Sequence, residues 1–524
     1  MNDPKILHLN SGLFNWYIPP EIKEFNGKKE VGKKASVDYM LFLEYLERYF
    51  LKNYEGDTIK YYEIRQNVLY DSNVDKMSDF VFEHIKQEKR KDIKQVISSP
   101  GFRGFTPKQI AKIHTIEPDI MRDTRDTTFL LYQNGFLSVK KDSSKFHHYS
   151  EMSPGLFVYE NQFCRDTKGN PRLFDNDLYN KDKDFKKSIF YKFIHNVMGE
   201  DEEKTKSLMS AIGYLVNNHK RPDLNKAVVL FDREYSDSPN GRTGKSLIMK
   251  SIGYCRNLNI ENGKNFDFEN RFAFQSLSSS TQILLIDDIR KFFNVEDLYV
   301  LLTDKFKIER KNQSPVILDN PPKMALTTNY SIKTTGDSSR ARVAEYPIHK
   351  VFSASYTPKD RFGKNFFSEF DLEDWFQFDL FIIECSRIFH SEGLIEIHDN
   401  ESAETKLMYD LGEELLEFLD NRFRPLIENE INEEKISRTK LRNEYLEKAE
   451  SAKSSDFKTF QKTTLFNLKL DQFLSARDLY YTSKDETGKF LKTNGERVIL
   501  IRNNFPKTTK RNSPGTPLLN VKFE

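Results

Sequence analysis

A loop with residues suited to holding a polyphosphate follows a short apolar run. The run is Ala227–Phe231, and the loop ends in Gly244-Lys245-Ser246. Strand, glycine-containing loop and helix, in that order, are typical of a phosphate-binding loop. Lys245 would place its ammonium beside the β- and γ-phosphates, and Ser246 would bind Mg²⁺ at the start of the helix. We therefore expect ATP and Mg²⁺ at the residues Pro239, Asn240, Gly241, Arg242, Thr243, Gly244, Lys245 and Ser246.

The match to a phosphate-binding loop is incomplete. The pattern GxxxxGK[ST] has glycine where Pro239 stands. A chance Gly-Lys-Ser in an ordinary loop is the alternative, so the chemistry of the following strands decides between the two interpretations.

A second apolar run ends in two carboxylates. Thr281–Ile286 leads directly into Asp287-Asp288, as in a strand that is buried on both faces of a parallel sheet. Ligands of open α/β sheets bind at the carboxyl ends of such strands. We expect Asp287 to hold Mg²⁺ through water and Asp288 to polarise the water that attacks the γ-phosphate. The alternative is an Asp pair that only caps a strand.

A third predicted strand, Lys323–Asn329, ends in an amide, and a segment with two arginines follows. Asn329 would orient the attacking water. A guanidinium of Arg340 or Arg342 would neutralise charge on the transferred phosphoryl group. The order of these elements within one short stretch is more specific than any one of them alone.

Together these elements resemble the superfamily 3 helicases, a branch of the AAA+ ATPases, and within them the poxvirus-type primase-helicase group of phages, plasmids and mobile elements. The resemblance is carried by Thr327-Thr328-Asn329-Tyr330 and by Arg342 with Pro347. It implies an α/β fold with a P-loop AAA+ core, hexameric homo-oligomeric rings, and translocation on single-stranded DNA at a forked duplex. Arg342 would be the arginine finger that reaches the ATP of a neighbouring subunit.

This sequence departs from the family pattern at three places. Pro239 replaces a glycine, Thr243 stands where Asn is common, and Ala341 separates Arg340 from Arg342. We select Arg342 as the finger by its spacing to Pro347, with Arg340 in reserve.

A segment with alternating cations, 303–313, lies between the second and third strands. Its cations are Lys305, Lys307, Arg310 and Lys311. The resemblance implies a hairpin in the channel of the ring that contacts DNA phosphates, with salt-sensitive and sequence-independent affinity. An ordinary solvated hairpin is the alternative.

We predict four segments in this chain of 524 residues. These are a mainly helical N-terminal domain of unknown role (1–120), a small helical domain (121–225), the helicase domain (226–400), and a linker helix followed by a winged-helix-like domain (401–524). Val37–Phe50 is an amphipathic helix whose aromatic stripe we assign to a core. Phe129–Val139 is a predicted hairpin with an Asn-Gly turn.

Charge is nearly balanced over the whole chain, with 81 basic and 79 acidic residues. Basic residues nevertheless exceed acidic ones in 435–524. The predicted winged helix there places Lys458, Lys462 and Lys469 on one helical face and would bind either duplex DNA or protein.

Three widely spaced cysteines, Cys164, Cys255 and Cys385, form no zinc or disulfide pattern. We find no signal peptide and no apolar run of about 18 residues. These features predict a cytoplasmic protein with no membrane partner. The only candidate for primase metal chemistry, Asp175-Asn176-Asp177, is in a turn-like setting. A separate primase or polymerase is therefore a further candidate partner.

Three functions follow from these residues. The first is an ATP-dependent helicase in replication of a phage, plasmid or mobile element. The second is an origin-binding initiator or loader that uses ATP as a switch. The third is a regulatory or defence NTPase with no role in DNA. DNA-stimulated turnover separates the third from the others, and processive unwinding separates the first from the second.

Overall fold

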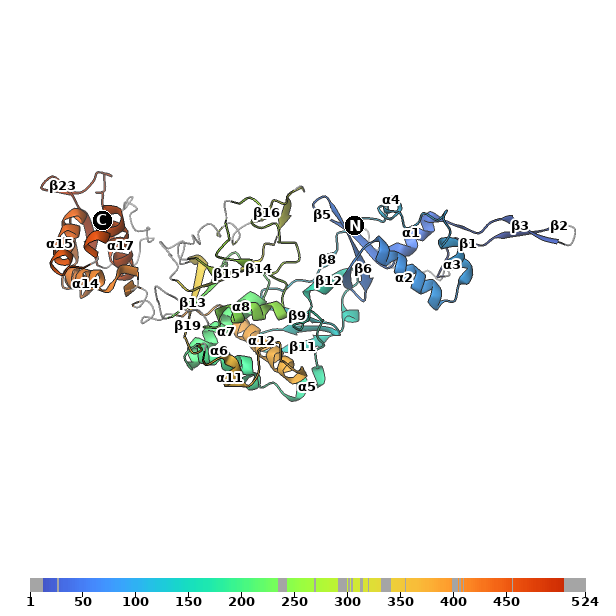
Figure 1. The fold of residues 1–524 in the computed structure, drawn as a ribbon, viewed down its shortest axis with the longest axis horizontal. Coiled ribbons are helices and arrows are strands. Elements are labelled where there is room, and N and C mark those ends of the chain that lie inside the picture. The colour runs from blue at the N-terminus through green and yellow to red at the C-terminus, as the bar shows by residue number, and fades with distance from the viewer. Residues whose placement is uncertain are drawn as a thin grey trace, which may run out of the picture.

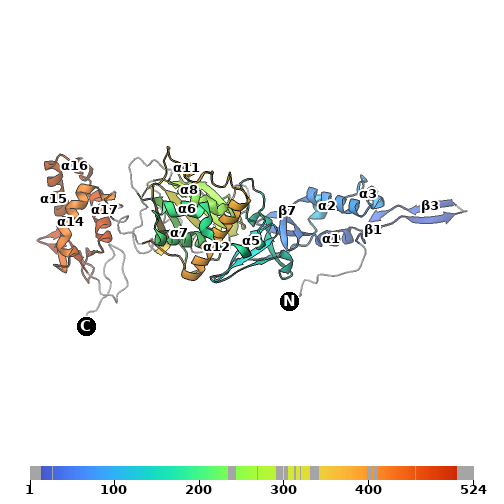
Figure 2. The same cartoon turned by 90° about the horizontal axis from the view of Figure 1, so that it is seen from below.

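The computed structural model describes residues 13–25, 28–233, 243–267, 270–290, 299, 302, 305–311, 314–318, 320–330, 341–353, 355–397, 404, 407–408, 410–454 and 456–503. Figures 1 and 2 show an elongated arrangement. The N-terminal strands and helices lie at one end, a sheet with its helices lies in the middle, and the C-terminal helices lie at the other end.

The central sheet has five strands, all parallel, in the order β14-β15-β18-β13-β19. It contains the three strands that the sequence predicts, each close to its predicted position. The strands are β13 (Ala227–Asp232), β14 (Leu258–Asn262), β15 (Ile283–Ile289), β18 (Lys323–Thr328) and β19 (Val343–Ile348).

Both faces of this sheet are buried, which explains why its strands are continuous apolar runs. On one face, Val228 and Leu230 join the core built by α6 (Ile189–Val197), α7 (Glu202–Val216), α8 (Lys245–Ser251) and α12 (Leu372–Glu392). On the other face, Ala227 and Val229 pack in a core with the hairpin of β16 (Phe306–Ile308) and β17 (Val316–Leu318). The molecule is thus mixed α/β.

The N-terminal region is not mainly helical, so that expectation is wrong. Its strands are β1 (Tyr17–Ile18), β2 (Glu21–Phe25), β3 (Lys28–Lys33), β4 (Ser36–Val37), β5 (Phe50–Glu55), β6 (Thr58–Arg65), β7 (Val68–Ser72) and β8 (Asp119–Ile120). Its helices are α1 (Tyr39–Glu47), α2 (Val74–Gln87), α3 (Lys91–Ile97) and α4 (Pro107–Ile110).

Left-handed turn residues explain the strands that the sequence analysis missed. Gly56 has φ 60° between β5 and β6, and Gln66 and Asn67 have φ 47° and 67° between β6 and β7. A Gln-Asn pair is a weaker hairpin signal than Asn-Gly. The five-stranded sheet β5-β6-β7-β12-β8 includes β12 (Leu156–Tyr159), so it extends across residue 120. The aromatic stripe of α1 is core, as predicted, because Phe42 and Tyr45 are fully buried.

The predicted Asn-Gly hairpin is confirmed. It joins β9 (Thr128–Tyr132) to β10 (Gly135–Val139), and β11 (Ser144–His147) completes a three-stranded sheet. The short elements that remain between residues 121 and 397 are α5 (Asn176–Lys181), α11 (Pro358–Phe362) and the 3₁₀ turns η1 (Tyr149–Glu151), η2 (Glu160–Gln162), η3 (Phe185–Lys187) and η4 (Ile252–Tyr254).

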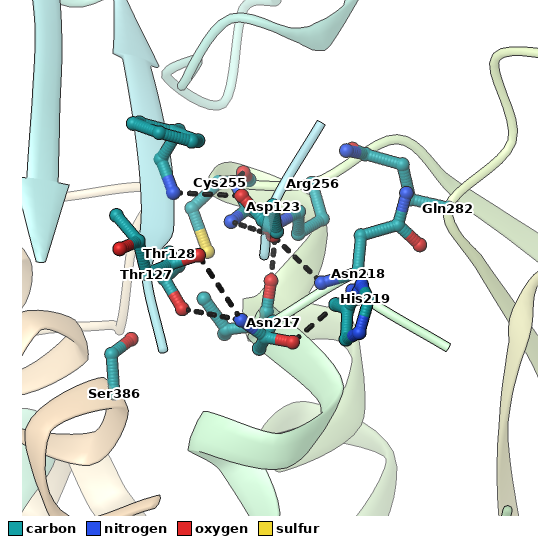
Figure 3. A network of polar contacts seen from close by, with 12 residues as sticks. Asp123, Thr127, Thr128, Asn217, Asn218, His219, Cys255, Arg256, Gln282 and Ser386 are labelled. Carbon is teal, nitrogen blue, oxygen red and sulfur yellow. Dashed lines mark hydrogen bonds and ion pairs between the residues drawn. The ribbon is translucent and has the colours of Figure 1, made fainter. Parts of the chain in front are cut away.

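A buried polar network fastens this segment to the central sheet (Figure 3). The carboxylate of Asp123 lies 3.2 Å from the guanidinium of Arg256 and accepts backbone hydrogen bonds from Phe129 and Asn218, both at 2.7 Å. Arg256 also donates to the carbonyl of Val216 at the end of α7. Because Arg256 follows α8 and η4, this network anchors the end of the helix that begins at Lys245.

The C-terminal residues form a separate core. Their helices are α14 (Glu413–Ile427), α15 (Arg438–Ser451), α16 (Asp456–Thr459) and α17 (Thr463–Ala476). Their strands are β20 (Glu433–Ile436), β21 (Tyr480–Thr482), β22 (Lys492–Thr493), β23 (Glu496–Arg497) and β24 (Ile499–Arg502). The predicted linker helix is instead part of the core, because Leu415, Leu419 and Phe423 of α14 are fully buried there.

The described helices include none that is both long enough and apolar enough to cross a membrane.

Candidate nucleotide-binding site

Lys245 lies where strands β13 and β18 end. Its ammonium donates to Oγ1 of Thr243 at 2.8 Å, to Oδ1 of Asn329 at 2.9 Å, and to the carboxylate of Asp232. Only 7% of its side chain is exposed. These three oxygen acceptors hold the Lys245 ammonium in place, and phosphate oxygens could take their place as its hydrogen-bond partners.

Two opposing effects act on the pKa of Lys245. Burial lowers the pKa of this ammonium, and the negative charge of Asp232 acts in the opposite direction, with a net lowering. Sequence analysis missed Asp232, although it is the last residue of β13 and so ends at the same edge as the other site residues.

Ser246 and Asp287 form the second part of the site. Oγ of Ser246 donates to Oδ1 of Asp287 at 2.6 Å, and so does Oγ1 of Thr327, also at 2.6 Å. Lys250, one turn along α8, lies 2.6 Å from Oδ2 of Asp287. Partial burial alone would raise the pKa of Asp287, but these hydrogen bonds outweigh it and the pKa is lowered.

Asp288 forms the third part, and its backbone is unusual. Its φ is 62°, and the register between β15 and β18 shifts between Ile286 and Ile289. Because of this bulge, consecutive carboxylates do not point to opposite faces of a flat strand. Non-glycine residues in such a conformation cluster at functional sites.

The Asp288 carboxylate has two different partners. The amide of Asn329 donates to its Oδ1 at 3.0 Å, and the ammonium of Lys264 lies 2.7 Å from its Oδ2. Asn329 therefore connects Lys245 to Asp288, since its side chain contacts both. No pattern in the sequence indicates a role for Lys264, which lies in the turn after β14.

Gly244 must be glycine for two reasons. Its φ is 93°, and a Cβ added there would lie 2.5 Å from the Phe193 ring. The positive φ directs the chain from the loop into α8, whose first residue is Lys245.

The remaining predicted site residues are only partly described. Pro239, Asn240, Gly241, Arg242 and Arg340 lie outside the described residues. Arg342 lies with its guanidinium 4.9 Å from the centre of the Tyr299 ring.

The predicted DNA-contacting segment forms a hairpin, with Lys307 of β16 opposite Ile317 of β17. Lys305, Lys307 and Lys311 are exposed. Arg310 is different, because its guanidinium lies 3.1 Å from the Glu55 carboxylate of the N-terminal region and donates to the Leu277 carbonyl at 2.8 Å.

These residues fit a nucleoside triphosphate with Mg²⁺. A lysine, a serine and a carboxylate that share a helix start and two strand ends are the donors that such a ligand needs. Ser246 and Asp287 would hold the ion, and Lys245 would contact the phosphates. When bound, Mg²⁺ would neutralise charge on the β- and γ-phosphates.

Comparison with known proteins gives little further information. A model of a family of unknown function, DUF5906, matches residues 236–342. No curated protein matches the chain.

Two solved structures of the NrS-1 C-terminal region in its apo A form are similar in part. The first has a TM-score of 0.32 and 11% identity, and the match covers 72% of this chain and 97% of that chain. The second has a TM-score of 0.28 and 12% identity, with 67% of this chain and 88% of that chain covered.

Proposed function

We propose that this chain is an ATP-driven DNA helicase of the superfamily 3 type. The observation that carries the proposal is the convergence of Lys245, Asp287, Asp288 and Asn329 at the carboxyl ends of three neighbouring parallel strands. Asp232 adds a counter-charge to the same edge. These are the side chains that bind phosphates, hold Mg²⁺ and polarise water.

The strand order supports a P-loop core of the AAA+ type. β18, which Asn329 directly follows, lies between the strand before the loop and the strand with the two acids. Asn329 is therefore placed to respond to both Lys245 and Asp288, as a residue that senses the γ-phosphate would be. In the reaction, Asp288 would accept a proton from the attacking water while Asn329 holds that water in line.

The helicase function also uses the resemblance in sequence. It implies hexameric rings in which Arg342 acts on the ATP of a neighbouring subunit and the β16–β17 hairpin contacts single-stranded DNA. The exposed Lys305, Lys307 and Lys311 support a phosphate contact. A role in replication of a mobile element, and a C-terminal domain of the winged-helix type, belong to the same proposal.

ATP hydrolysis and forked-duplex unwinding by the native protein and by Lys245→Ala test this proposal. We expect Lys245→Ala to lower turnover by about 100-fold or more, because the phosphates lose their main cation. Lys192→Ala, at an exposed lysine of α6, is the matched control and should leave turnover unchanged. Full turnover by Lys245→Ala would refute the site.

A mixing experiment tests the finger. Arg342→Ala should abolish turnover, and subunits that keep Arg342 but carry Asp288→Asn should partly restore it in mixed rings. No restoration would argue against a finger supplied by a neighbour. Turnover without DNA stimulation would favour a regulatory NTPase, and stimulation without processive unwinding would favour an initiator or loader.

A further inference from the structure

Cations gather on the β22–β23 hairpin of the C-terminal core, far along the chain from the nucleotide site. We define the cationic hairpin as residues 484–497. Lys492 of β22 and Arg497 of β23 are directly opposite each other in the antiparallel register, and both are exposed. Like charges placed opposite each other destabilise a strand pair. Such a pair is stabilised when an anion binds between them.

An exposed aromatic ring holds two of these cations in place. The guanidinium of Arg497 lies 4.3 Å from the centre of the Phe490 ring, and the ammonium of Lys484 lies 5.1 Å from it. Phe490 itself is 45% exposed. A ring orders a cation without cancelling its charge, whereas a carboxylate would neutralise it.

Two of the three acidic residues of the cationic hairpin, Asp485 and Glu496, have partners other than the side chains of its four cations. The Asp485 carboxylate accepts hydrogen bonds from the backbone of Thr487 and Lys489, at 2.9 and 3.0 Å. Glu496 lies 3.2 Å from the ammonium of Lys440 on α15.

Within the described residues, none of the four cations has a carboxylate within ion-pair distance. These cations are Lys484, Lys489, Lys492 and Arg497.

Helix α17, which a winged helix would be expected to insert into DNA, lacks such a surface. Lys469, predicted to lie on a DNA-facing side, is part-buried and donates to the carbonyl of Asp410. The exposed positions of α17 are Thr463, Thr464, Leu468 and Ala476, and none of them is charged.

From these contacts we propose that the cationic hairpin, rather than α17, is the nucleic-acid contact of the C-terminal domain, and that its ligand is a phosphodiester backbone. Four cations spread along one hairpin fit a repeated anion. A protein partner is disfavoured because charged residues are depleted at the centres of protein interfaces. The proposal stands independently of ATP hydrolysis.

Fluorescence anisotropy of the full chain with labelled duplex and labelled single-stranded oligonucleotides tests the proposal. A background with Lys305, Lys307 and Lys311 replaced by Gln removes the contribution of the β16–β17 hairpin. In this background, Lys492→Gln with Arg497→Gln should weaken binding about tenfold. The slope of log affinity against log salt should fall by about two for duplex DNA, because two phosphate contacts are lost.

Two further variants test whether a folding defect, or a DNA contact near α17, explains the loss of binding. Glu496→Gln removes a negative charge from the cationic hairpin and should tighten binding about twofold to threefold, which a misfolded domain would not do. Lys458→Gln in α16, combined with Lys462→Gln just before α17, should change affinity less than about twofold.

The outcomes separate the alternatives. A loss of affinity for only duplex or only single-stranded DNA identifies that form as the ligand of the cationic hairpin and supports the proposal. Unchanged DNA binding in the Lys492 and Arg497 double variant overturns the proposal. A larger loss of DNA affinity in the Lys458 and Lys462 double variant also overturns it. Weakened self-association in sedimentation without loss of DNA binding would make this hairpin a protein interface and also overturn it. Because these measurements contain no ATP, a negative result here leaves the proposed ATPase function unaffected.

Discussion

The proposed nucleotide site and the cationic hairpin are both rich in charge, but the charges of the first are paired within the protein and the four cations of the second have no ion-pair partner among the described residues. In the nucleotide site each ion has an internal partner: Lys245 has Asp232, Asp287 has Lys250, and Asp288 has Lys264. On the cationic hairpin, Arg497 and Lys484 contact an aromatic ring. A ligand of the first site must replace existing ion pairs, whereas a ligand of the second replaces only water and salt ions.

This difference indicates selectivity in one place and general attraction in the other. The Lys245–Asp232 pair is buried, and buried charges that lose a partner are costly, so a ligand that displaces this pair must match its geometry. Exposed cations bind any polyanion that follows their spacing, with strong dependence on salt. The β16–β17 hairpin has both kinds of cation. Arg310 is paired with Glu55, whereas Lys307 is exposed.

The largest effect should come from removing one internally held carboxylate. Asp288→Asn keeps the size of the side chain, but an amide cannot accept the proton of the attacking water. We therefore expect turnover to fall by about 10²- to 10⁴-fold. Binding of a fluorescent ATP analogue should change little. Asp223→Asn, at an exposed carboxylate paired with Arg221, is the control. Turnover within about threefold of the parent would mean that Asp288 is not the base.

An intermediate effect is expected where the ion-pair partner is removed from a cation of the proposed DNA contact, Arg310. Glu55→Gln should release Arg310 and tighten single-stranded DNA binding by about threefold, because one more cation becomes available to phosphates. Arg310→Ala alone should have less than about a twofold effect, yet a larger one in the Glu55→Gln background.

A double-mutant cycle of DNA affinities measures this coupling. Glu63→Gln, which breaks the exposed pair with Arg65, serves as the control. Strictly additive effects of Glu55→Gln and Arg310→Ala would show that the Glu55 contact does not restrain the β16–β17 hairpin.

The smallest effect concerns pH. Lys245 must be protonated to bind phosphates, and burial already lowers its pKa while Asp232 opposes that change. Asp232→Asn should therefore lower the pKa of Lys245 further, so kcat/KM for ATP is lost at a lower pH on the alkaline side. We expect a shift of about one pH unit or less. An alkaline limb that stays in place or moves to higher pH would contradict the pairing.

Much of the central sheet could be predicted from the sequence because its signals are local. An apolar run followed by Asp287-Asp288, or by Asn329, indicates both a strand and the end at which its polar residues lie. The Asn134-Gly135 and Asn494-Gly495 turns indicate hairpins for a similar reason, because Asn-Gly is a strong local turn signal. In the second turn both residues have positive φ, 50° and 84°.

The N-terminal region resisted the same reasoning. Its hairpin turns at Gly56 and at Gln66-Asn67 are weak signals, and its strands mix polar and apolar residues over surfaces that are only part-buried. The apolar stripe of α1 is a stronger local pattern, and it led to the wrong prediction that the whole region is mainly helical.

The sequence by itself determined which residue types stand at the strand ends and that a glycine precedes Lys245. Only the tertiary structure decided the pairing of their charges: Asp232 with Lys245, Lys264 with Asp288, and Glu55 with Arg310. The physical reason is that strand type depends on neighbours along the chain, whereas an ion pair depends on a distance of a few ångströms between segments that the sequence does not place together.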